Sequence, residues 1–181
     1  MDRTGEQRDR LPAADETARR VATAAGLDPD ALAREVQYAP QPRLALARAA
    51  DLVGGASAIG GLTREQRIAL WSVLGGSGHL SRVLTAEAAW QSWLRREVRD
   101  GPGVGELPPL PQESASPTES AALLRRFRQK AFLRIGARDL WGVAALEETL
   151  ASLTATAELA IDYATRLARR ELETEYGPLE L

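Results

Sequence analysis

The feature that most constrains the fold is a long amphipathic pattern in the last third of the chain. Apolar residues there recur at alternating spacings of four and three, which places them on one face of a helix. These residues are Leu146, Leu150, Leu153, Ala157, Ala160, Ala164 and Leu167. Because the central residues are small, a neighbouring helix can approach closely. The pattern predicts a long helix packed through this face and ending at Gly177 and Pro178.

A second long helix is predicted directly before the first. Ser116 is placed as an N-cap, Pro117 suits the first helical position, and Glu119 lies three residues after the cap. This helix is expected to reach about Asp139, and Gly142 ends it. Two long helices with a short connection are expected to form an antiparallel hairpin over residues 117–181.

A proline- and glycine-rich stretch separates this hairpin from the region before it. Residues 100–116 hold four prolines and three glycines, so no regular element is expected there and a surface loop is predicted. Residues 1–99 are predicted to form several short helices. The predicted fold class is all-α: short N-terminal helices, a loop, and a long helical hairpin without a catalytic sheet.

Local signals mark where the short helices start. Asp28 is followed by proline at the first helical position, and Thr63 and Gln66 have the spacing of a capping box. A glycine pair at Gly75 and Gly76 breaks the next helix, and Ser77 can cap the one that follows.

Composition narrows the possible chemistry. The chain has no cysteine, which excludes a disulfide scaffold, a thiolate nucleophile and a cysteine-ligated metal. Its formal net charge of −2 does not favour nucleic acid or an anionic membrane as a partner. No apolar run reaches the roughly 18–20 residues that span a bilayer. Residues 1–10 lack the apolar core of a signal peptide, so a cytoplasmic location is expected.

No catalytic, cofactor-binding or metal-binding residue is predicted. His79 is the single histidine and follows a glycine turn, where capping or packing explains it better than catalysis. Asp28 and Asp30 have the Asp-x-Asp spacing of a two-metal site, but their context is helical and a proline lies between them. We interpret Asp28 as a helix N-cap.

A basic run on the first hairpin helix is the strongest candidate for an interaction surface. Six basic side chains accompany an apolar stripe of Leu124, Phe127, Ala131 and Ile135. The candidate interaction residues are Arg125, Arg128, Arg134, Arg138 and Asp139. One interpretation is a solvated face whose long stems cover apolar surface. The other is a polar dock for a neighbouring domain or an acidic partner. RNA binding is disfavoured because no aromatic platform lies alongside.

The same segment resembles a known enzyme family. An R-x-F-R…L-R-I-x-x-x-D pattern is formed by Arg125, Phe127, Arg128, Leu133, Arg134, Ile135 and Asp139. It resembles the helical segment that precedes the nucleotidyltransferase domains of the bacterial bifunctional glutamine synthetase adenylyltransferase/deadenylylase family. Residues 146–160 resemble the family's next helix, and residues 70–84 resemble its N-terminal helical pattern. The resemblance spans about residues 62–181 and places the chain before the first, deadenylylating half.

The resemblance implies a role in nitrogen metabolism. Members of the family control glutamine synthetase by adding AMP to a tyrosine or removing it by phosphorolysis, with signalling by PII proteins and glutamine. ATP and magnesium are implied only for the full-length family, which is a nucleotidyltransferase. Its glycine-rich helix start and Asp-x-Asp metal ligands are absent from these 181 residues and are expected beyond Leu181.

Two functions are therefore expected from the resemblance. The first is an N-terminal fragment that scaffolds the adjoining catalytic domain and is silent alone. The alternative is a free-standing helical interaction module that binds glutamine synthetase, PII or a separate catalytic half. Without a catalytic domain, the apolar face of the hairpin that it would cover is expected to be exposed and to favour self-association or instability.

Overall fold

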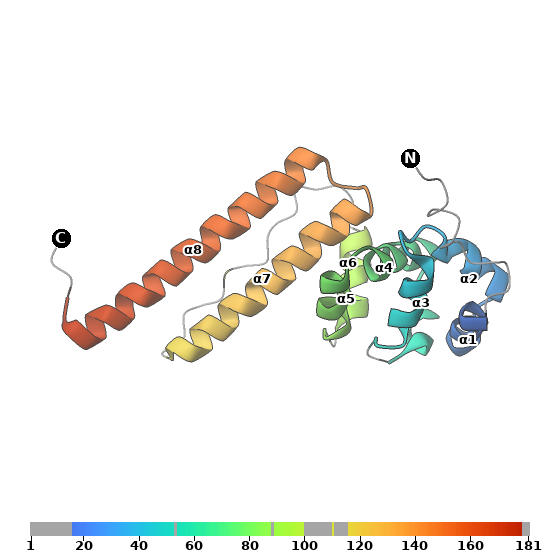
Figure 1. The fold of residues 1–181 in the computed structure, drawn as a ribbon, viewed down its shortest axis with the longest axis horizontal. Helices are drawn as coiled ribbons and strands as arrows, with labels where there is room; N and C mark the ends of the chain where they lie inside the picture. Colours follow the sequence, from blue (N-terminus) through green and yellow to red (C-terminus); the bar gives the residue numbers. More distant parts are fainter. Residues whose placement is uncertain (1–15, 53, 88, 100–109, 111–115, 179–181) are drawn as a thin grey trace, which may run out of the picture. The chain divides into compact units, whose positions relative to one another are not determined.

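The computed structural model describes residues 16–52, 54–87, 89–99, 110 and 116–178. Helices are the only regular elements in these ranges, which confirms the all-α fold class (Figure 1). The shorter ones are α1 (Glu16–Ala25), α2 (Pro29–Val36), α3 (Pro42–Ala49), η1 (Ala56–Ile59), α4 (Arg64–Gly76), α5 (Gly78–Thr85) and α6 (Trp90–Arg99). The two long helices are α7 (Pro117–Leu140) and α8 (Leu146–Tyr176). The predicted loop over 100–116 lies outside the described residues, except at its last residue and Leu110.

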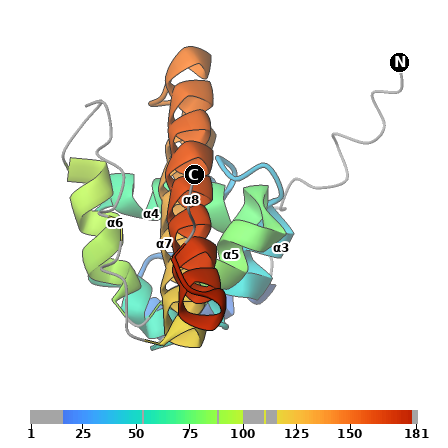
Figure 2. The same ribbon diagram turned by 90° about the vertical axis from the view of Figure 1, so that its left-hand side faces the viewer.

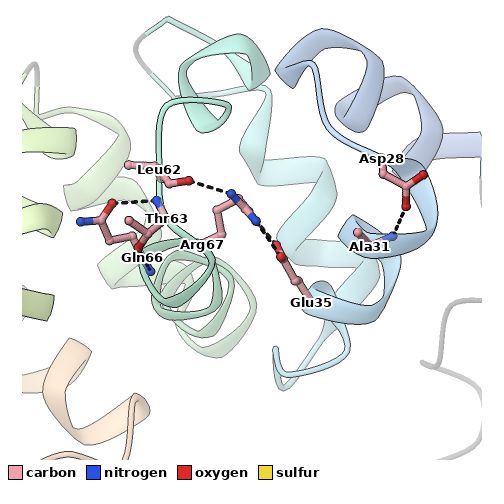
Figure 3. Close-up of polar contacts among 7 residues, drawn as sticks. All are labelled: Asp28, Ala31, Glu35, Leu62, Thr63, Gln66 and Arg67. Carbon is pink, nitrogen blue, oxygen red and sulfur yellow. Dashed lines mark hydrogen bonds and ion pairs between the residues drawn. The ribbon is translucent and has the colours of Figure 1, made fainter.

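The predicted helix starts are confirmed at four caps, including Ser116, whose hydroxyl accepts a hydrogen bond from the Glu119 amide at 3.4 Å at the start of α7. Asp28 accepts a hydrogen bond from the Ala31 amide at 2.7 Å, and Pro29 begins α2. At α4, the Thr63 hydroxyl accepts from the Gln66 amide at 3.3 Å, while the Gln66 side chain accepts from the Thr63 amide at 3.0 Å (Figure 3). Ser77 caps α5. Each cap satisfies an amide that the first turn of a helix leaves without a partner.

The chain divides into two compact units. The first holds α1 to α6 together with Gly136–Ala144, which includes the last turn of α7. Its core lies around α4, which packs against α2, α3, α5 and α6, while α1 packs against η1, α2 and α3. Among its largest fully buried side chains are Trp71, Trp90, Leu32, Leu46, Leu70 and Leu74.

The segment Gly136–Ala144 is fastened within the first unit by specific contacts. The Trp141 indole donates to the Ala69 carbonyl at 2.7 Å, and its ring lies 6.1 Å from that of Trp93. Gly136 permits the close approach of Leu80, because a β-carbon there would lie 2.6 Å from the Leu80 Cδ1. A small residue at this point of α7 is therefore a packing requirement.

The second unit consists of α8 and most of α7. The two helices run in opposite directions and are joined by residues 141–145 (Figures 1 and 2), which agrees with the predicted hairpin. Of the predicted apolar stripe on α7, Phe127, Ala131 and Ile135 are buried and Leu124 is half-buried. On α8 the buried residues are Thr156, Tyr163 and Leu167.

The predicted packed face of α8 is wrong. Leu146, Leu150 and Leu153 are 65%, 54% and 37% exposed, and Leu167 is the one fully buried residue of the predicted seven. The buried face lies about 100° around the helix from the leucine face, one residue along the chain. It includes the large ring of Tyr163 and the hydroxyl of Thr156, which donates to the Ser152 carbonyl at 2.7 Å. Apolar periodicity identified an apolar face correctly but did not identify what covers it.

Candidate interaction surface

The exposed side of α7 carries a group of basic residues. Arg125, Arg126, Arg128 and Lys130 are all exposed, while Phe127 between them is buried. Arg125 and Arg128 are three residues apart and therefore neighbours on the helix surface. The Arg128 guanidinium lies 5.7 Å from the centre of the Phe132 ring, a cation–π distance that helps to fix its position. We call these four residues the α7 basic face.

The remaining predicted interaction residues are placed differently. Arg134 is half-buried, and Arg138 is only 5% exposed and belongs to the first unit. Asp139 is exposed. The structure therefore brings Arg125 and Arg128 to one exposed face and does not add Arg138 to it. Whether these residues bind a partner stays a prediction.

A second exposed surface lies on α8. Its large apolar residues include Ile161 at 67% and Leu172 at 46% exposure, besides the three exposed leucines already described. Exposed alanines fall between them on the same face. We call this set the α8 stripe: Leu146, Leu150, Leu153, Ala157, Ile161, Ala164, Ala168 and Leu172. Apolar surface that a domain leaves exposed along one continuous face is typical of an interaction site.

Two arginines that sequence reasoning missed are tied to distant carbonyl and carboxylate groups. Arg67 forms a bidentate ion pair with Glu35, in which the Nε–Oε2 and Nη2–Oε1 distances are both 2.7 Å. The Arg67 guanidinium also donates to the Leu62 carbonyl at 2.7 Å (Figure 3). The hydrogen bond to Glu35 raises the pKa of Arg67, with partial burial opposing it. Arg48 donates to the carbonyl of Leu74 at 2.6 Å and so satisfies the end of α4. Partners 32 and 26 residues away leave no local signal in the sequence.

Asp28 and His79, the residues weighed for metal binding and catalysis, both lie at helix starts. The Asp28 carboxylate is engaged as the cap of α2, and His79 is exposed in the first turn of α5. In the part of the chain that the structure describes, no three His, Cys, Asp or Glu side chains are grouped to hold a metal ion. None of the described helices is long and apolar enough to cross a membrane.

Comparison with known proteins confirms the family resemblance. Residues 105–180 match the family model described as glutamate-ammonia ligase adenylyltransferase, and this range includes both helices of the hairpin. No solved structure matches the chain.

Curated relatives agree with that match. The chain is 30% identical over 114 residues to a bifunctional glutamine synthetase adenylyltransferase/adenylyl-removing enzyme of Bordetella pertussis, covering 59% of this chain and 12% of the relative. Proteins of the same description from Nitrosomonas eutropha and Thioalkalivibrio sulfidiphilus are 34% identical over 96 residues and 32% over 115 residues. Those alignments cover 51% and 60% of this chain, and 10% and 12% of the relatives. The matched stretch is thus a small part of the relatives' length.

Proposed function

We propose that this chain is a helical module that scaffolds a nucleotidyltransferase domain and is catalytically silent alone, because residues 105–180 match the glutamate-ammonia ligase adenylyltransferase family model. The observation that carries the proposal is the position of the family match. It falls on α7 and α8, whose outward faces bear exposed charged and apolar side chains.

The α7 basic face supplies a means of docking. Arginine presents five donors in a planar fork that fits a carboxylate with two parallel hydrogen bonds. Arg125 and Arg128 present two such forks one turn apart, on a helix whose opposite side is anchored by Phe127. An acidic surface on an adjoining catalytic domain would match this spacing. We assign the α7 basic face to that contact.

The wider assignment follows from the family. Glutamine synthetase is the proposed substrate of the complete assembly, PII the proposed signalling partner, and the cytoplasm the proposed location. ATP and magnesium belong to the proposed catalytic domain, since no residue of this chain is assigned to hold them.

A binding and activity experiment tests the proposal. The chain alone is expected to release no AMP from adenylylated glutamine synthetase, while it binds a catalytic domain taken from the Bordetella relative. Arg125→Glu/Arg128→Glu is expected to weaken that binding at least tenfold, since it places like charges against an acidic surface. Arg19→Glu/Arg20→Glu makes the same charge change on exposed residues of α1 and is expected to leave binding unchanged. AMP release by the chain alone, or equal losses in both variants, would contradict the proposal.

The alternative function is a free-standing module that binds glutamine synthetase, PII or a separate catalytic half. The exposure of the α7 basic face favours it, since those guanidiniums can engage any acidic partner. Calorimetric titration of the chain with purified glutamine synthetase and PII distinguishes the two functions. Tight binding to either protein without a catalytic domain supports the alternative, whereas binding only to the catalytic domain supports the scaffold.

A further inference from the structure

The α8 stripe has a symmetric arrangement along the helix. From Leu146 to Ala168 its spacings are four, three, four, four, three and four, which read the same from either end. The centre of this pattern of spacings is Ala157. At about 100° per residue, all these positions fall within about 80° of one another on α8, and the edge at Leu153 adjoins the buried Leu167. A helix with this pattern can meet an identical helix running the opposite way, so that each stripe residue from Leu146 to Ala168 faces another, while Leu172 lies beyond the symmetric part.

We propose that the α8 stripe binds the α8 stripe of a second copy of this chain, antiparallel, with the two-fold axis at Ala157. The inference goes beyond the proposed function, because it uses a different face of the hairpin from the α7 basic face. An isologous interface of this kind is the commonest route to a closed homodimer.

The sizes of the side chains fit this pairing. In the antiparallel arrangement Leu146 lies opposite Ala168 and Leu150 opposite Ala164, so a large side chain meets a small one at both ends. The intermediate layers pair Leu153 with Ile161, and the central layer pairs Ala157 with its own copy. A parallel pair would instead set leucine against leucine at one end and alanine against alanine at the other. The end layers favour the antiparallel pair, because a large side chain there meets a small one, whereas the parallel pair sets identical side chains against each other in every layer.

Charges beside the stripe favour the same direction. On the flank of α8 away from its buried face, exposed Glu147 lies near the start of the stripe and exposed Arg169 near its end. Antiparallel pairing brings Glu147 of each copy to Arg169 of the other, twice by symmetry. Arg169 already bonds Glu173 in its own helix at 2.8 Å, but an exposed pair of this type is weak and can be shared. In-register parallel pairing would leave Glu147 and Arg169 at opposite ends of the interface.

One residue opposes the pairing and so provides a test. Glu158 is exposed on the same flank, one residue from the proposed two-fold axis. The two copies therefore bring their Glu158 carboxylates towards each other, which costs affinity. Glu158→Gln is expected to lower the dimer dissociation constant several-fold, most clearly at low salt. A higher dissociation constant would contradict the proposed position of the axis.

Disulfide trapping tests register and direction, because the chain has no cysteine of its own. Ala157→Cys is expected to form a disulfide with itself and to double the 19.6 kDa mass on a non-reducing gel. Leu150→Cys alone is expected to stay unlinked, whereas a mixture of Leu150→Cys with Ala164→Cys is expected to form the linked pair. Ala151→Cys is the matched control, exposed on the same helix but off the stripe. Self-linkage of Leu150→Cys would indicate a parallel pair and overturn the proposal.

The mass in solution tests dimerisation without any cross-link. Light scattering is expected to give twice the chain mass for the natural sequence and a monomer for Leu153→Glu, with unchanged helical circular dichroism. Ala151→Glu adds the same charge two residues away and is expected to stay dimeric. A monomer throughout a concentration series of the natural sequence would overturn the proposal and leave the scaffold function untouched.

Discussion

At the scale of single residues, the buried polar contacts define which side chains the fold depends on. Glu35 is 4% exposed, and its pair with Arg67 joins α2 to α4. Because hydrogen bonding to Glu35 raises the pKa of Arg67, the guanidinium stays charged in the folded chain. Its contribution to stability is complete below the ordinary pKa of arginine and is lost only as pH rises through the raised value. Stability due to Arg67 is therefore constant through the neutral range.

Removing one partner of this pair is expected to be costly. Glu35→Ala leaves a largely buried guanidinium without its carboxylate, and we expect the free energy of unfolding to fall by about 3 kcal/mol. Replacing both partners, in Glu35→Leu/Arg67→Met, is expected to recover most of the loss because no charge is then left unpaired. Urea denaturation followed by circular dichroism measures both changes.

The control for this prediction is an exposed ion pair. Asp162→Ala breaks the pair with Arg166 on the surface of α8 and is expected to cost less than about 0.5 kcal/mol. Equal losses for Glu35→Ala and Asp162→Ala would contradict the role assigned to the buried pair.

At the scale of elements, the helix boundaries could be predicted from the sequence, because they depend on residues that are close together in the chain. The caps at Asp28, Thr63 and Ser77 involve groups three residues apart, so the residues that form them are adjacent in the sequence. The hairpin was likewise predicted from helix start and stop signals. The packed face of α8 was not, because two faces of that helix carry apolar residues and the choice between them depends on tertiary packing. The hydrogen bonds made by Arg48 and Arg67 could not be predicted either, because their partners are distant in the sequence.

Gly136 offers a test of packing at the element scale. Replacing it with alanine gains about 1 kcal/mol in helix propensity but places a β-carbon against the buried Leu80. We expect a net loss of stability of roughly 1 kcal/mol in Gly136→Ala, since overpacking typically costs more than the gain.

The effect of Gly136→Ala on stability is expected to change sign when the Leu80 side chain is truncated. In a Leu80→Ala background, Gly136→Ala retains the propensity gain without the clash, so it is expected to stabilise the chain. A double-mutant cycle from thermal or urea unfolding gives the coupling between the two positions. If the effects of Gly136→Ala and Leu80→Ala on the free energy of unfolding are additive, Leu80 is not the reason that a glycine is needed at position 136.

At the scale of the whole molecule, one unit is a helical core and the other carries both candidate interaction surfaces. The first unit is a helical core that fastens the end of α7, and the hairpin presents the α7 basic face and the α8 stripe. The basic residues of the candidate site could be predicted from the sequence, because a charge run is visible directly. That Arg138 is buried while Arg125 and Arg128 are exposed could not, since their different burial depends on tertiary packing.

The most direct measurement is AMP release from adenylylated glutamine synthetase, with this chain titrated into the isolated catalytic domain of the Bordetella relative. A scaffold is expected to raise the rate of that domain and to saturate, while the chain alone releases nothing. Arg125→Glu/Arg128→Glu is expected to shift the half-saturating concentration upwards without changing the plateau. A rate that does not respond to the chain, with correctly folded components, would contradict the proposed scaffold function.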